Sequence, residues 1–260
     1  MSVSNYPIKD LASMPIFGLN VSKASATSLT VAAGTCRDST NKLDMTLGSA
    51  YPNLESKTVT APITLDATVN GANGLDAGSL AASTVYAVYV IADSTAYQNT
   101  AGLISTSLTA PTMPTGYNAW RMVGFAVTDG SSHFLDMFQM GQANNRKIYF
   151  DTKIATAVTA GNSTTYANVA LTSFVPALDN TLVYVDSVYT PASAGNLLSL
   201  QKFGATGAQA EVKGQVNAVV IETRNELPAG LNSGVPTIAY KVGNAGDAVA
   251  LNIRGFEYFV

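Results

Sequence analysis

The sequence predicts an all-β protein, built from two antiparallel β-sandwich or jelly-roll-like domains in tandem behind an extended N-terminal arm. Strand-type runs rich in Val, Ile, Thr and Tyr recur along the chain and are separated by Gly, Pro, Asn and Ser. No long stretch shows the clean 3.6-residue apolar period of an amphipathic helix. The turn signals recur at about 8–12 residues, a spacing typical of sandwiches and barrels.

A polar stretch at Gln142–Arg146 marks the expected boundary between a first domain, residues 26–145, and a second, residues 146–260. Residues 1–25 have little periodicity and are predicted to form the arm. Because apolar side chains in an exposed arm mark an interaction site, we expect the arm to anchor the protein through Ile16, Phe17 and Leu19.

In the first domain, Val85–Ile91 is apolar at every position, as a strand covered on both faces should be. Trp120–Val127 has the same character. An Asp-Gly turn at Thr128–Ser131 and a further strand at His133–Met140 complete a predicted β-hairpin.

In the second domain, strands are predicted at Leu182–Tyr189 and at Val212–Thr223. A second hairpin is predicted from Thr237–Val242, a turn at Gly243–Asp247, and Ala248–Phe256. The last arm alternates apolar and wet positions, which indicates a strand with one solvated face.

The composition indicates a subunit that is packed against other subunits. Only 12% of the residues are charged, against about 25% in ordinary soluble domains, and 47% are hydrophobic. The net charge is −3, and residues 1–145 hold nine acids and six bases while residues 146–260 hold eight of each. Neither half therefore carries a basic face for nucleic acid. The longest apolar run, Val85–Ala92, is far shorter than the ~20 residues of a membrane span, so no membrane insertion is expected.

Four segments stand out along the chain. The first is Leu29–Thr40, which is preceded by Phe17–Asn20 and ends in RDST. Two glycine-framed turns, each followed by an apolar strand, come next, and a strand pair closes the series: Gly74–Ala92, Pro111–Gly124, and Ala239–Gly243 with Ala248–Gly255. In this order the four segments resemble virion appendage proteins of tailed bacteriophages, the head-fibre, decoration and tail-fibre group. In the family, consecutive basic residues often precede the second strand, whereas here Arg121 stands alone.

The resemblance implies a structural protein assembled in the host cytoplasm and located in the virion. The expected form is an oligomeric capsid-bound fibre or decoration subunit, a homotrimer bound to the major capsid protein or another virion protein. The alternative is a short tail fibre or receptor-binding protein that recognises host surface glycan. Head and tail placement stay open at this point.

The residues that bear chemistry do not form a catalytic pattern. His133 is the only histidine and stands beside a turn, and Cys36 is the only cysteine, so a triad or a thiolate zinc site lacks partners. Asp136, Glu222 and Glu226 are a conceivable carboxylate set for glycoside cleavage, but their spacing brings no two of them together. We expect no enzyme activity, no cofactor and no metal.

The remaining candidates favour structure over binding. The glycine-rich loop Gly71–Gly78 lacks the lysine and helix of a phosphate loop, and Asp76 is expected to bond backbone N–H groups in that turn. Aromatic rings can stack on sugars, but core or interface packing is favoured for Tyr86, Tyr89 and Trp120. Tyr117 follows a Pro/Gly turn and is the ring predicted to be exposed for surface binding.

Overall fold

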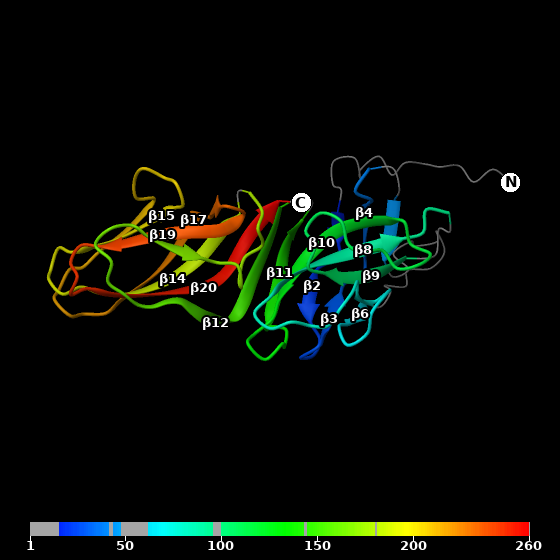
Figure 1. Ribbon diagram of the computed structural model, residues 1–260, viewed down its shortest axis with the longest axis horizontal. Helices are drawn as coiled ribbons and strands as arrows, with labels where there is room; N and C mark the ends of the chain where they lie inside the picture. Colours follow the sequence, from blue (N-terminus) through cyan, green and yellow to red (C-terminus); the bar gives the residue numbers. More distant parts are fainter. Residues whose placement is uncertain are drawn as a thin grey trace. The chain divides into compact units, whose positions relative to one another are not determined.

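The computed structural model describes residues 16–41, 44–47, 62–95, 100–142, 145–179 and 181–259. None of these described segments is helical, and the strands confirm the predicted all-β fold. The chain divides into two compact units, with the division between Arg146 and Lys147. Within each unit, strands pair into more than one sheet around a buried apolar core (Figure 1).

The first unit contains three sets of paired strands. The first set pairs in the order β1 (Ile16–Gly18), β4 (Gly34–Arg37) and β5 (Asp44–Leu47). The second pairs in the order β10 (Ala119–Val127), β8 (Val85–Ala92), β9 (Thr100–Ser105) and β7 (Gly74–Leu75). The third pairs in the order β11 (Met137–Gln142), β2 (Val21–Lys23), β3 (Ser28–Val31) and β6 (Ile63–Asp66). The pair of β7 with β9 is parallel. In β8, the side chains at positions 86–92 are all buried, as the continuous apolar run predicts.

A β-bulge couples two of these sets of strands. Between Met122 and Gly124 the register of β10 against β8 shifts, and Val123 is the extra residue. The side-chain amide of Gln139 in β11 donates to the Val123 carbonyl at 3.0 Å. A Cβ at Gly124 would lie 2.3 Å from the Gln139 amide oxygen and 2.5 Å from Val21, so the bulge and its glycine make room for the buried amide.

The second unit contains two sheets. One has the order β17 (Ile221–Pro228), β14 (Leu182–Thr190), β20 (Ala248–Phe259) and β12 (Asn145–Gly161), which starts two residues before the division. The other has the order β13 (Ala167–Ala170), β19 (Val235–Val242), β15 (Leu197–Lys202) and β16 (Ala210–Lys213), with β18 (Gly230–Asn232) also paired to β19.

Both predicted hairpins are wrong in the same way. The strand before each turn and the strand after it enter different sheets: β10 pairs with β8 while β11 pairs with β2, and β19 pairs with β15 while β20 pairs with β14. After the first turn, only a single bridge joins Thr128 to Phe134. A tight turn fixes a reversal of chain direction, but packing decides which sheet the next strand joins.

The predicted strand at Val212–Thr223 is also wrong. The structure ends β16 at Lys213 and begins β17 at Ile221. Between them the backbone turns at Ala218, which has a φ of 56° and donates its N–H to the Pro191 carbonyl. The apolar run in this loop is solvent-facing, with Val216, Val219 and Val220 each at least half exposed.

The predicted arm is too long. Its first fifteen residues lie outside the described residues, but β1 and β2 are paired strands of the first unit. The buried guanidinium of Arg146 donates to the carbonyls of Gly18 and Leu19 at 2.9 and 3.3 Å, which fixes the turn between these strands. The segment from Ile16 onward therefore belongs to the first unit.

Candidate functional site

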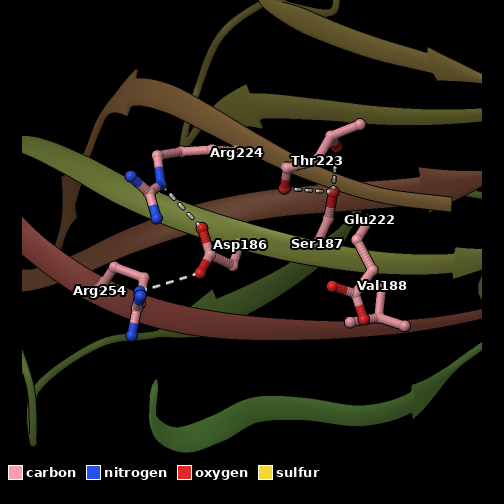
Figure 2. Close-up of a pocket in the computed structure, with 7 residues that line it drawn as sticks. All are labelled: Asp186, Ser187, Val188, Glu222, Thr223, Arg224 and Arg254. Carbon is pink, nitrogen blue, oxygen red and sulfur yellow. Dashed lines mark hydrogen bonds and ion pairs between the residues drawn. The ribbon is translucent and has the colours of Figure 1, made fainter. Parts of the chain in front are cut away.

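A shallow depression lies on the outer face of the second unit's sheet, over β14, β17 and β20. Its volume is about 310 Å³. Alternate residues of a strand face the same side, so the face is built from every second position of each strand. Figure 2 shows the lining residues. Two cross-strand pairs, Asp186 with Arg224 and Val188 with Glu222, face the depression, and the pair between them, Ser187 with Thr223, also lines it. The seventh lining residue is Arg254 of β20.

Asp186 lies between two arginines. It is the register partner of Arg224, whose Nε lies 3.0 Å from Oδ1, and the Nε of Arg254 lies 3.0 Å from Oδ2 (Figure 2). The side chain of Asp186 is only 15% exposed, whereas that of Arg224 is 55% exposed. One carboxylate therefore holds two guanidinium groups in place while Arg224 still faces solvent.

Arg254 reaches Asp186 because β20 contains a bulge. Tyr184 pairs with Gly255 and Val185 pairs with Ile253, so Arg254 is the extra residue between them. Bulges commonly change the direction of one side chain beside a functional site. A Cβ at Gly255 would lie 2.0 Å from the Ile148 carbonyl oxygen, and its φ of 154° suits glycine.

The second cross-strand pair supplies an apolar contact beside a carboxylate. Val188 is half-buried and is paired with Glu222 across β14 and β17. Its partner on the other side, in β20, is the small residue Ala250. Behind the face, the hydroxyl groups of Ser187 and Thr223 lie 2.8 Å apart and hold the two strands together.

An aromatic and charged cluster continues along the same sheet. The rings of Tyr149 and Tyr184 are stacked, 5.0 Å apart and 6° from parallel. Glu257 accepts a hydrogen bond from the Tyr184 hydroxyl at 3.0 Å and pairs with the Lys147 ammonium at 3.0 Å. Burial raises the pKa of Tyr184, and the pKa of Lys147 is raised by its hydrogen bond to Glu257. Tyr184 therefore stays protonated and Lys147 stays charged at neutral pH.

The side chains around the depression offer hydrogen-bond donors and acceptors. The hydroxyl groups of Ser187 and Thr223, behind the face, are bonded to each other and to the side-chain amide of Asn225. The two arginines of the depression offer N–H donors, and its two carboxylates are acceptors. Among the described residues, no three His, Cys, Asp or Glu side chains lie together as a metal site would require.

The three predicted anchoring residues do not share one environment. Ile16 and Leu19 are fully buried in the first unit, which corrects the prediction that they insert into a partner. Phe17 is 60% exposed. Two further exposed apolar side chains, Phe138 and Met140, point outward from β11, where Phe138 pairs with Ser22 of β2. The alternation of β11 would have placed these two side chains in the core, because its polar Gln139 is the buried residue, so no sequence pattern indicated their exposure.

The predicted aromatic candidates are mostly core residues. Tyr86 and Tyr89 are buried; Tyr86 packs edge-on against Phe134, and Tyr89 packs edge-on against Trp120. Tyr117 is half-buried after its turn, in which its N–H donates to the Pro114 carbonyl.

The titratable candidates are separated by the fold. Cys36 is buried in β4, while His133 is exposed and lies 3.9 Å from Asp129. Asp136 pairs with Lys23 at 3.0 Å in the first unit. Glu222 and Glu226, by contrast, belong to the second unit, two strand positions on either side of Arg224.

Asp76 links the two segments that begin with glycine-framed turns. Its Oδ2 accepts from the Ser105 hydroxyl at 2.6 Å and from the backbone N–H of Thr112 at 3.0 Å. The sequence predicted backbone bonds within the turn itself, whereas this bond reaches the start of the next segment. The strands that follow the two turns, β8 and β10, are neighbours in one sheet.

Comparison with known proteins gives little. No family model matches the chain, and no curated protein matches it. A carbohydrate-binding module of Cellvibrio mixtus lichenase 5A, solved with cellotriose, is 8% identical over 45% of this chain and 86% of that one, with a TM-score of 0.25. A structure of infectious bursal disease virus, strain Gx, is 14% identical over 92% and 76%, with a TM-score of 0.14. Neither TM-score carries an argument about fold or function. Within the described part of the chain, no helix is long and apolar enough to cross a membrane.

Proposed function

We propose that this chain is a structural protein of a tailed-phage virion, an oligomeric fibre or decoration subunit bound to the capsid and exposed on the particle. The observation that carries the proposal is that the two segments with glycine-framed turns, which resemble phage virion proteins, lie side by side in the fold. They supply the neighbouring strands β8 and β10, and Asp76 of the first segment bonds the Thr112 N–H at the start of the second. Two of the four segments that resemble phage virion proteins thus supply neighbouring strands of the first unit.

The exposed apolar side chains of the first unit support attachment to another virion protein. Phe17, Phe138 and Met140 are 60%, 46% and 47% exposed. In a chain with so few charged residues, such side chains suit burial in an interface, where aromatic residues and Met are enriched. We assign the attachment surface to these residues, with the major capsid protein or a neighbouring virion protein as its partner.

Incorporation into particles tests the attachment surface. Host cells would express the wild-type chain, the Phe138→Ser variant or the Val219→Ser variant, and would be infected with a phage that lacks this gene. Val219 is the matched control, because it is equally exposed but lies in a loop of the second unit. We expect Phe138→Ser to fold but to be reduced at least tenfold in purified particles, while Val219→Ser incorporates normally. Normal incorporation of Phe138→Ser would contradict this assignment.

The oligomeric state is a second test. We propose a homotrimer because the resemblance to phage appendage proteins implies that state. The few charged and many apolar residues of the chain also favour subunit contacts larger than the ~800 Å² per partner of a standard complex. Light scattering of the purified chain should give three times its 27.0 kDa mass. A stable monomer at micromolar concentration would contradict the trimer.

A second candidate function is recognition of host surface glycan, as in a short tail fibre or receptor-binding protein. The depression of the second unit favours it, because planar hydrogen-bonding side chains line a solvent-facing hollow there. Binding of oligosaccharides by the purified chain tests this candidate without particles.

A further inference from the structure

We infer that the depression on β14, β17 and β20 binds a neutral, hydroxyl-rich sugar through Arg224, Glu222 and Val188. This inference rests on the second candidate function alone. It moves the expected contact from Tyr117 in the first unit to the face of a sheet in the second.

The first step of the argument is preorganisation. A flexible arginine loses side-chain entropy when it orders on a ligand. Here Asp186 holds Arg224 and Arg254, each through Nε at 3.0 Å, before any ligand arrives. A guanidinium has five N–H donors, and the bond from Arg224 to Asp186 uses one of them. Arg224 therefore presents oriented donors at little further entropic cost.

The second step is the balance of charge. Two arginines and two carboxylates line the depression, so its formal charge is zero. A phosphate, sulfate or carboxylate would gain from the arginines but would be repelled by Asp186 and Glu222 at close range. A sugar hydroxyl group both donates and accepts, so it can bond an arginine and a carboxylate at once. The lining therefore favours a neutral ligand over an ionic one.

The third step is shape. The volume of about 310 Å³ lies at the lower end of the ~300–1,000 Å³ usual for small-ligand sites. Val188 offers an apolar contact for the C–H groups of a sugar ring, while its cross-strand partner Glu222 meets the hydroxyl groups. An apolar surface with a few placed polar groups is the usual composition of such sites.

The test starts from an array of neutral, sialylated, sulfated and phosphorylated oligosaccharides, probed with the full chain. We expect retention on neutral oligosaccharides. Calorimetry with the best of these should give a Kd that changes less than twofold between about 0.1 and 1 M NaCl, because no net charge is paired. Retention only on acidic oligosaccharides, or on none, would overturn the inference.

Variants then locate the site. Arg224→Ala and Glu222→Ala should each weaken binding at least tenfold, and Arg254 continues to hold Asp186 in both, so the sheet stays paired. Glu226→Ala is the matched control, on the same strand and face but outside the depression, and should bind within twofold of wild type. Unchanged binding by both site variants, with circular dichroism showing them folded, would overturn the assignment. Loss of oligosaccharide binding leaves the virion role standing, because particle incorporation measures that role separately.

Discussion

The turn from β10 to β11 in the first unit and the turn from β19 to β20 in the second both carry the chain from one sheet into another, and each contains an aspartate. Asp129 accepts from the backbone N–H groups of Ser131 and His133 at 2.8 and 2.9 Å, and its side chain is 41% exposed. The first turn is thus held by its own residues.

Asp247 is 2% exposed, and its four donors include groups far from it in the sequence. The four donors lie 2.6 to 3.0 Å from the Asp247 carboxylate oxygens: the Tyr189 hydroxyl, the Ala192 N–H, the Asn196 amide and the Asn244 N–H. The second turn is thus fastened to the connection between β14 and β15. The two turns show that one residue type can serve a local turn or a tertiary joint, according to its burial.

The largest expected effect follows from this difference. Asp247→Ala should lower the free energy of unfolding by about 3–5 kcal/mol, because four donors lose a buried charged acceptor. Asp129→Ala, the matched change in the first unit, should cost much less, because water replaces the exposed carboxylate as the acceptor. Chemical denaturation of both variants measures the two values, and equal losses would break the comparison.

The sequence predicted three long, mostly buried strands of the sheets, but it did not predict which sheet the chain enters after a tight turn. Val85–Ile91, Trp120–Val127 and Leu182–Tyr189 were placed within one residue of the observed strands, because their apolar and β-branched composition is decided locally. Which sheet follows a tight turn is decided by contacts such as those of Asp247, which join residues more than fifty positions apart.

The candidate site was only partly visible in the sequence. Ala250, Asn252 and Arg254 were predicted as the wet positions of the last strand, but Asn252 is buried, and of the three only Arg254 lines the depression. Its approach to Asp186 depends on a bulge and on the register of β14 with β20, which no local pattern encodes. The sequence did not indicate that Glu222 and Arg224 share one face of a strand, because the intervening Thr223 and the following Asn225 are polar too and hide the alternation of β17.

The bulge glycines give the next largest effect. Gly255→Ala should cost about 2–3 kcal/mol, because its Cβ meets backbone atoms of β12 and its φ is positive. Gly124→Ala should cost about 1–2 kcal/mol, since the atoms nearest to its Cβ would be side-chain atoms, those of Gln139 and Val21, and not backbone. Thermal unfolding of the two variants orders them, and a larger loss for Gly124→Ala would contradict this account of the bulges.

Acid should weaken the second unit through Asp247. Burial raises the pKa of this carboxyl group, but the hydrogen bonds from Ala192, Asn196, Tyr189 and Asn244 outweigh burial and hold the pKa below its ordinary value. The stabilisation is therefore complete above the unfolded value of about 3.9 and is lost as pH falls through the lower folded value.

Amide exchange of β14 between about pH 5 and pH 2 measures this loss. Wild type should lose protection steadily across this range, and Asp247→Ala should show a smaller change from a lower starting point. An equal pH dependence in both proteins would assign the acid sensitivity to other groups.

The smallest effect is expected at the only histidine. His133 is exposed and 3.9 Å from Asp129, and exposed pairs contribute about 0–1 kcal/mol. His133→Ala should change the free energy of unfolding by less than about 0.5 kcal/mol and leave oligosaccharide binding unchanged. Loss of binding in this variant would place the ligand on the first unit and contradict the assignment to the second.

The virion role is tested most directly by quantitative mass spectrometry of density-purified particles from the phage that encodes this chain. The account predicts the chain in the particles at a fixed ratio to the major capsid protein, and in multiples of three if the trimer holds. A chain that is abundant in the lysate but absent from the purified particles would contradict it.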